Sequence, residues 1–117
     1  SMSTVEEKRK CIRYNLNATS EITFQDDGKT CQGDIRDISV GGFFIELDNR
    51  LSPTDNNRLV EFHIYADICS TKTIVIGDGR IVRVTAEGIG IFFEVITDEQ
   101  KKQLHKIISE LRHLMNE

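Results

Sequence analysis

Two arginines near the start of the chain are the first residues whose type and spacing suggest chemistry. Arg9 and Arg13 lie four positions apart, and Lys8 and Lys10 flank the first of them. A guanidinium group pairs with a phosphate through two parallel hydrogen bonds and stacks its planar face on a nucleobase. Basic residues in such a cluster also form solvated tails, and charge alone favours that simpler interpretation.

The stretch Asp37-Ile-Ser39-Val-Gly41-Gly42 is the second pattern of interest, because it separates two strand-like segments. Asp and Ser side chains hydrogen-bond backbone amides in turns, and glycine adopts backbone angles that other residues avoid, so a purely structural turn accounts for the pattern. The same residues also suit a ligand. Asp37 and Ser39 offer polar oxygens, and the two glycines permit close approach to the backbone. Taken alone, the pattern leaves both interpretations open.

Signatures of catalysis and of bound cofactors are missing elsewhere in the sequence. It contains no phosphate-binding G-x-x-x-x-G-K-[ST] loop and no His-Glu-x-x-His helix, and its three histidines are scattered. The three cysteines are odd in number and include no C-x-x-C spacing, which argues against a disulfide framework and against structural zinc. We therefore expect no metal, no cofactor and no enzymatic activity.

Composition narrows the class of partner and the cell compartment. The chain has 117 residues, an ordinary single-domain size, and a formal net charge of −4. A generic nucleic-acid binder is usually basic over the whole domain, so this acidic balance argues against that class. No stretch approaches the roughly 18 consecutive apolar residues of a membrane span, and the N-terminal residues contain no apolar signal-peptide core. We expect a cytoplasmic protein, with no nucleic-acid binding and no membrane insertion.

Alternating apolar and polar residues predict strands over much of the chain. The expected strands are residues 21–24, 31–38, 43–47, 58–65, 73–85 and 89–95. In the fourth of these, Val60, Phe62 and Ile64 point to one side. In the second, strict alternation places Asp37 on the same side as Ile35. Glycines inside the fifth strand predict that this long strand bends.

After Thr97 the period of the apolar residues changes to that of a helix. The expected apolar face consists of Leu104, Ile107, Ile108, Leu111 and Met115. Thr97 and Gln100 have the spacing of a capping box, which places the helix start directly after Thr97. Short strands followed by one helix indicate an all-β sandwich or barrel, in which the helix covers an opening or lies beside the sheet.

The two motifs, in this order and within this pattern of strands and helix, resemble the PilZ domain family. The family pattern is R-x-x-x-R in an N-terminal arm, then D/N-x-S-x-x-G at a strand-to-strand turn, and both match here without substitution. The similarity covers roughly residues 8–114. It implies a mostly β fold, a six-stranded antiparallel β-barrel with a C-terminal α-helix at 98–115. It also divides the chain into a flexible arm, residues 1–18, and the barrel with its helix, residues 19–117.

The resemblance also implies a ligand, because members of the family bind the bacterial second messenger cyclic di-GMP. Guanine presents O6 and N7 as paired acceptors to an arginine fork, while its N1–H and N2–H groups suit a carboxylate. Arg9 and Arg13 are thus expected at the phosphates and guanine faces, and Asp37 at a guanine edge. The full expected ligand site is Arg9, Arg13, Asp37, Ser39, Gly41 and Gly42, with Lys8 and Lys10 as additional cations.

In the family, the arm closes over the ligand and a downstream protein reads the changed surface, in motility, polysaccharide or biofilm control. Two alternatives stay open. The barrel has lost its ligand and serves only as a protein-interaction module, or it binds single-stranded nucleic acid, which requires exposed aromatics along a basic groove. A third, an enzyme acting on a nucleotide, has no catalytic residues to support it.

Overall fold

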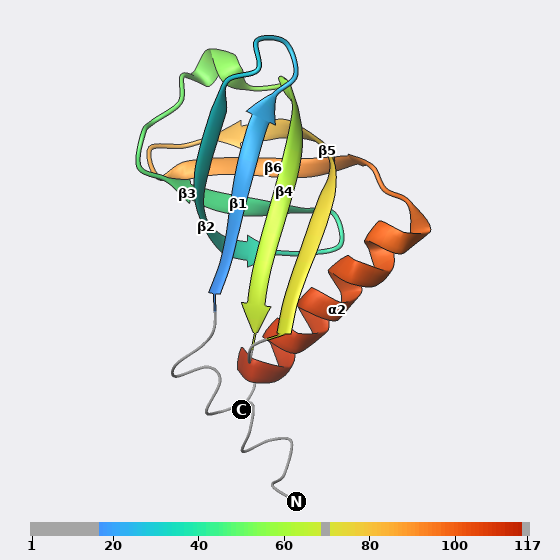
Figure 1. Ribbon diagram of the computed structural model, residues 1–117. Coiled ribbons are helices and arrows are strands. Elements are labelled where there is room, and N and C mark those ends of the chain that lie inside the picture. Colours follow the sequence, from blue (N-terminus) through green and yellow to red (C-terminus); the bar gives the residue numbers. More distant parts are fainter. Residues whose placement is uncertain (1–16, 69–70, 116–117) are drawn as a thin grey trace, which may run out of the picture.

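The structure is a computed structural model that describes residues 17–68 and 71–115. Over these ranges the chain forms one closed antiparallel barrel of six strands, followed by one long helix (Figure 1). Around the barrel the strands lie in the order β1-β2-β3-β6-β5-β4. The elements are β1 Asn17–Phe24, β2 Thr30–Ile38, β3 Gly42–Leu47, η1 (a 3-10 turn) Pro53–Asp55, β4 Leu59–Ile68, β5 Thr71–Val84, β6 Gly88–Val95 and α2 Asp98–Met115. The predicted barrel with a C-terminal helix is confirmed.

Alternation along the strands fills the barrel with apolar side chains. On β4, Val60, Phe62 and Ile64 are at most 1% exposed, as their spacing predicts. The centroid of the Phe62 ring lies 5.4 Å from that of Phe43 and 5.2 Å from that of Phe93. Tilted and edge-on pairs at such distances are favourable arrangements for aromatic rings. This packed interior gives the residues of the outer face a rigid support.

β5 is long because it closes the barrel. Its first part pairs with β4 and its second part pairs with β6. The register with β6 shifts between Asp78 and Gly79, and again between Ile81 and Arg83. The first shift leaves an extra residue on β6 and the second leaves one on β5, and such bulges bend the strands (Figure 1). The single bent strand that the sequence predicts is thus confirmed, and its last part pairs with β6 on the side away from β3.

α2 lies beside β5 and covers part of the barrel interior (Figure 1). Its start is capped as predicted, because the Thr97 amide donates to Gln100 Oε1 at 2.7 Å and the Gln100 amide donates to Thr97 Oγ1 at 3.1 Å. Three residues of the predicted apolar face are buried: Leu104, Ile107 and Ile108. The side chains of the other two lie outside those that the structure describes: Leu111 and Met115.

β2 departs from strict alternation at the position that matters for the site. Its register with β3 shifts between Ile35 and Asp37, so β2 carries an extra residue there. The sequence-based placement of Asp37 on the same side as Ile35 is therefore wrong. Ile38 packs against the core instead, and both Arg36 and Asp37 are exposed. The reason is that a bulge inserts one residue and reverses the facing of everything after it.

The turn between β1 and β2 is tied to the η1 segment by Arg58. Its Nη1 donates to Asp55 Oδ1 at 2.7 Å, its Nη2 pairs with Asp26 and Asp27, and its guanidinium carbon lies 3.8 Å from the centroid of the Phe24 ring. The hydrogen bond from Arg58 lowers the pKa of Asp26 below its ordinary value. Folding and carboxylate ionisation are therefore linked at this end of the barrel.

This linkage predicts how stability varies with pH. A carboxyl with a depressed folded-state pKa stabilises the fold above its unfolded pKa, and the contribution is lost as pH falls through the folded value. The difference in unfolding midpoint between the parent and Arg58→Gln is thus expected to be complete at neutral pH and to shrink below about pH 4. Urea unfolding at several pH values measures it. Arg50→Gln, which removes an exposed arginine that forms no ion pair within the described ranges, should show no such trend. A parent–Arg58→Gln difference independent of pH would contradict the linkage.

Candidate functional site

The Asp37–Gly42 segment is a turn between β2 and β3 that is held by its own hydrogen bonds. The Ser39 amide donates to the Gly42 carbonyl at 2.8 Å, and the Gly41 amide donates to Ser39 Oγ at 3.2 Å. The Ser39 hydroxyl also donates to the Gly42 carbonyl at 3.4 Å. A hydroxyl has one hydrogen and two lone pairs, so one lone pair of Ser39 remains for a ligand donor. Ser39 therefore stabilises the turn and also keeps one lone pair that can accept a hydrogen bond from a ligand.

The two glycines of this turn have different roles. A Cβ at Gly42 would lie 2.0 Å from the carbonyl oxygen of Ile91, and this steric clash excludes any side chain at that position. Gly42 is therefore required by the close approach of β3 to β6. A Cβ at Gly41 would meet only Ser39 Oγ at 3.9 Å, so the space beside Gly41 is open. Only Gly41 offers the unobstructed backbone that a ligand needs, and neither glycine has a positive φ.

Asp37 presents its carboxylate on the outer face of the barrel. It is exposed and lies opposite Phe44 on β3. Within the described part of the chain, no hydrogen bond or ion pair engages its carboxylate. An unengaged carboxylate beside a rigid turn is well placed to accept hydrogen bonds from a ligand.

The remaining predicted site residues precede the described part of the chain. Arg9, Arg13, Lys8 and Lys10 lie outside the described residues. The structure does show where the chain enters the barrel, because β1 begins at Asn17 and pairs antiparallel with β2. Its residue Thr19 lies opposite Asp34, only three positions before Asp37. The start of β1 is thus beside the part of β2 that leads into the turn.

The profile of one protein family matches most of the chain. The PilZ domain family matches residues 7–110. The chain belongs to the PilZ family. This membership confirms the expectation that the chain is a receptor domain rather than an enzyme.

Solved structures of PilZ domains share this fold. The PilZ domain of YcgR from Escherichia coli, determined with c-di-GMP, has a TM-score of 0.63 and 13% identity, covering 88% of this chain and 92% of that one. The PilZ domain of CeSA from a cellulose-synthesizing bacterium has a TM-score of 0.58 and 17% identity, covering 84% of this chain and 94% of that one. No curated protein sequence matches the chain. At these identities the two structures support the fold alone.

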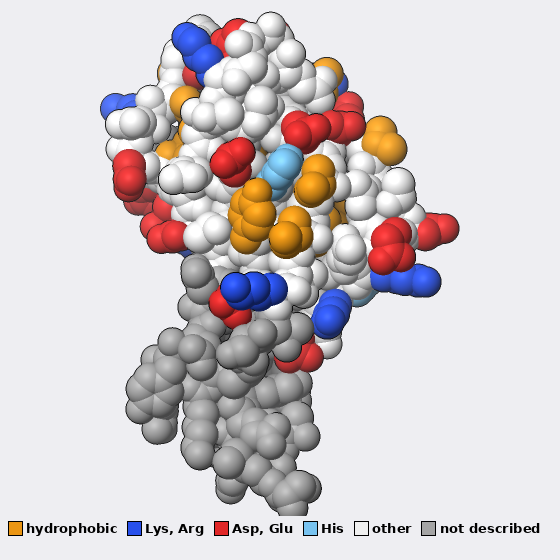
Figure 2. Space-filling view, viewed as in Figure 1, with side chains coloured by type: hydrophobic (Ala, Val, Ile, Leu, Met, Phe, Trp, Pro, Cys, Tyr) orange, Lys and Arg blue, Asp and Glu red, His pale blue; other side chains and the backbone are white. Residues whose placement is uncertain are grey.

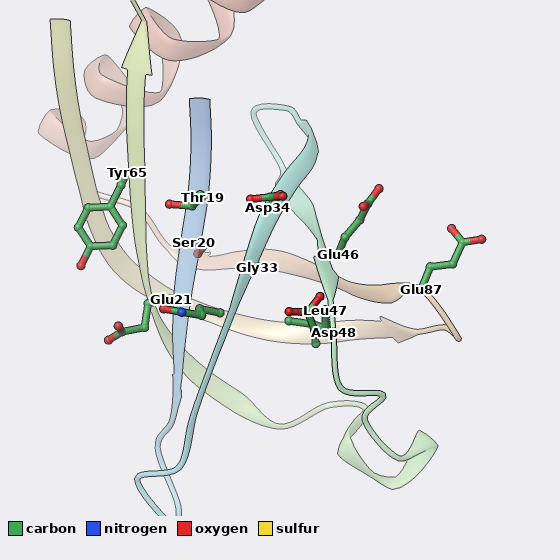
Figure 3. A pocket seen from close by; sticks show the side chains of 11 residues that line it. Thr19, Ser20, Glu21, Gly33, Asp34, Glu46, Leu47, Asp48, Tyr65 and Glu87 are labelled. Atoms are coloured by element: carbon green, nitrogen blue, oxygen red, sulfur yellow. The ribbon is translucent and has the colours of Figure 1, made fainter. Parts of the chain in front are cut away.

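An acidic groove lies outside β1, β2 and β3 of this PilZ barrel (Figure 3). It measures about 590 Å³ and does not include the Asp37–Gly42 turn. Carboxylates from β1, β2, β3 and the adjoining loops line it: Glu21, Asp34, Glu46, Asp48 and Glu87. Like charges repel an anionic ligand, so size alone does not make this groove the nucleotide site. The surface beside Asp37 is the better candidate, because the exposed Arg36 precedes Asp37 on β2 and lies over Phe44, the residue opposite Asp37.

A second surface feature lies on the other side of β1. Hydrophobic side chains gather over β4 and β5 (Figure 2), where Tyr65, Ile74 and Ile76 are 39–52% exposed. Tyr65 pairs directly with Ile74 across the two strands, and His63 pairs with Ile76. This patch belongs to β4 and β5 rather than β2 and β3, so it is separate from the Asp37–Gly42 turn.

The described side chains offer little for other chemistry. They include no group of three or more residues that could hold a metal ion. Burial raises the pKa of the Cys31 thiol, which keeps it protonated and poorly nucleophilic at neutral pH. In the described ranges, no helix is both long and apolar enough to cross a membrane.

Proposed function

We propose that this PilZ domain binds cyclic di-GMP through Arg9, Arg13 and the Asp37–Gly42 turn, and relays binding to a partner protein. The observation that carries the proposal is the turn itself. The β2 bulge directs Asp37 outward beside open backbone at Gly41, close to where the chain enters the barrel. The match to the YcgR PilZ domain determined with c-di-GMP supports the choice of ligand.

Chemical complementarity supports the assignment of Asp37. Guanine carries N1–H and N2–H donors on one edge, and a carboxylate with no other hydrogen bond accepts both. Adenine has no N1–H donor, so the same carboxylate disfavours it. Ser39 adds one acceptor, and the uncovered backbone at Gly41 lets the base approach. Asp37 is therefore the proposed source of selectivity for guanine.

The reach of the N-terminal residues is sufficient for this site. Arg13 precedes the first residue of β1, Asn17, by four positions, and Arg9 precedes it by eight. An extended chain spans at most about 3.5 Å per residue, so Arg13 can lie up to roughly 14 Å from Asn17 and Arg9 up to roughly 28 Å. Both arginines, with Lys8 and Lys10 beside them, can thus reach a ligand held at the turn.

The proposed mechanism is closure of an arm. The arm is the segment before β1. The predicted boundary between residues 18 and 19 is two residues too late, because Asn17 and Ala18 already pair with β4 as part of the barrel. Ligand contacts must offset the conformational entropy that is lost when the arm is ordered. The ordered arm and the adjacent barrel surface then constitute the signal that a downstream protein reads. We place the protein in the bacterial cytoplasm, in the control of motility, polysaccharide or biofilm.

Calorimetric titration of the full chain with cyclic di-GMP, cyclic di-AMP and GMP tests the proposal. We expect binding of cyclic di-GMP and much weaker binding of the other two. Absence of heat with cyclic di-GMP, from a chain shown to be folded, would favour the alternative function, a protein-interaction module without a ligand.

Asp37→Ala tests the role of the carboxylate. Loss of charge-assisted hydrogen bonds to guanine is expected to weaken cyclic di-GMP binding by about tenfold or more and to reduce the preference over cyclic di-AMP. Asp34→Ala is the matched control, because Asp34 is also an exposed carboxylate of β2. If the two variants bind alike, Asp37 has no special role.

A further inference from the structure

Phe44 lies on the outer face of the barrel and is nevertheless buried. Its neighbours on β3, Phe43 and Ile45, belong to the core cluster, whereas Phe44 does not, yet only 3% of it is exposed. The ring lies against positions of β6 that have no side chain. A Cβ at Gly88 would lie 2.9 Å from the ring, and one at Gly90 would lie 3.9 Å from it. The Phe44 ring is thus held in a fixed position against the outer face of β6.

Two arginine side chains cover the Phe44 ring. The guanidinium carbon of Arg36 lies 4.2 Å from the centroid of the Phe44 ring, and that of Arg83 lies 5.0 Å from it. Both distances are within the range of attraction between a cation and an aromatic ring. We name the surface formed by Arg36, Phe44, Gly90 and Arg83 the Phe44 platform.

The charges of the two arginines are balanced differently. Arg36 pairs with Glu46 at 3.4 Å and with Glu87 at 2.7 Å. Arg83 is exposed, and no carboxylate in the described ranges forms an ion pair with it. A guanidinium has five N–H donors, and those of Arg83 remain available to an anion. The platform therefore carries, on β5, a guanidinium group that is free to bind an anion.

Arg83 lies in the same row of paired residues as Asp37. The residues pair across neighbouring strands in one row, from Asp37 to Phe44, from Phe44 to Gly90 and from Gly90 to Arg83. Adjacent strands are about 4.8 Å apart, so the row spans roughly 14 Å. A cyclic dinucleotide carries two phosphates between its two bases. When one base of the ligand is at Asp37, the phosphates of the ligand lie over β3 and β6, between Asp37 and Arg83.

We propose that Arg83 binds a phosphate of the cyclic dinucleotide that lies over the Phe44 platform. This inference rests on the proposed function and extends it, because neither sequence motif includes Arg83. The barrel then supplies a fixed cation at one edge of the ligand, and Arg9 and Arg13 supply theirs from the arm.

Charge-changing variants of Arg83 test the inference by calorimetric titration of the full chain with cyclic di-GMP. Arg83→Met keeps an extended apolar chain over Phe44 but removes the charge, and we expect about tenfold weaker binding or more. Arg83→Lys keeps a cation that pairs with phosphate, and should retain most of the affinity. Arg50→Ala is the matched control, since Arg50 is exposed and follows the opposite end of β3, and should bind like the parent.

The salt dependence of binding separates a phosphate contact from a structural role. Salt screens exposed charge pairs, so Arg83→Met should show a weaker dependence of affinity on salt than the parent. Equal affinity and equal salt dependence in Arg83→Met and the parent overturn the assignment of Arg83 while the parent still binds. If the parent itself does not bind cyclic di-GMP, the proposed function fails and this inference fails with it.

Discussion

Alanine at Arg9 or at Arg13 is expected to weaken cyclic di-GMP binding by about a hundredfold. Each guanidinium can make two charge-assisted hydrogen bonds to a phosphate or to guanine O6 and N7, and alanine removes them together with the charge. The effect should exceed that of Arg83→Met, because the two arm residues are proposed to hold the bases as well as the phosphates. Titration calorimetry of each single variant measures the loss.

The fold provides the control for this experiment. Both residues precede β1, which begins at Asn17, so the barrel should unfold at the same temperature in either variant as in the parent. Arg50→Ala again serves as the control for the loss of one exposed arginine. Should Arg9→Ala and Arg13→Ala both bind like the parent, the R-x-x-x-R motif is not part of the site.

Gly42→Ala is expected to destabilise the barrel by about 3 kcal/mol, the upper end of what overpacking usually costs. The added Cβ would lie 2.0 Å from the carbonyl oxygen of Ile91, and a backbone atom in a strand ladder cannot move aside as a side chain can. Relief requires β3 and β6 to separate where they pair. Urea unfolding followed by circular dichroism measures the loss.

Gly41→Ala is the matched control, since its Cβ would have no neighbour nearer than Ser39 Oγ at 3.9 Å. This variant should unfold like the parent and lose affinity for cyclic di-GMP, because a methyl group would stand where the ligand approaches the backbone. Equal stability of the two variants would contradict the separate roles of the glycines. Unchanged affinity in Gly41→Ala would remove Gly41 from the ligand site.

The elements of the fold were largely predictable from local patterns. The alternation of Val60, Phe62 and Ile64 predicts a half-buried strand, and all three are buried. The Thr97 and Gln100 pair predicts the start of α2, and both capping hydrogen bonds are present. These features depend on residues close together in sequence, which is why sequence reasoning finds them.

The composition of the proposed site was only partly predictable. The two sequence motifs indicate the turn, but neither contains Phe44 or Arg83. One signal was available: Phe43 and Phe44 are consecutive on a strand, so one of the two must face outward. What covers an outward ring depends on how the β2 bulge and the distant strand β5 place their side chains over it. The partnership of Arg36 and Arg83 over Phe44 is therefore a tertiary property.

The sequence by itself determined the family, the strand and helix order, and the two motifs, because these are carried by residue types at short, regular spacings. Only the tertiary structure decided which way Asp37 faces, since a bulge depends on the register between β2 and β3. It also separated the roles of Gly41 and Gly42, because the reason for Gly42 is the carbonyl of Ile91 on β6. Contacts between distant strands leave no local pattern in the sequence, and they build the outer surface on which the proposed site rests.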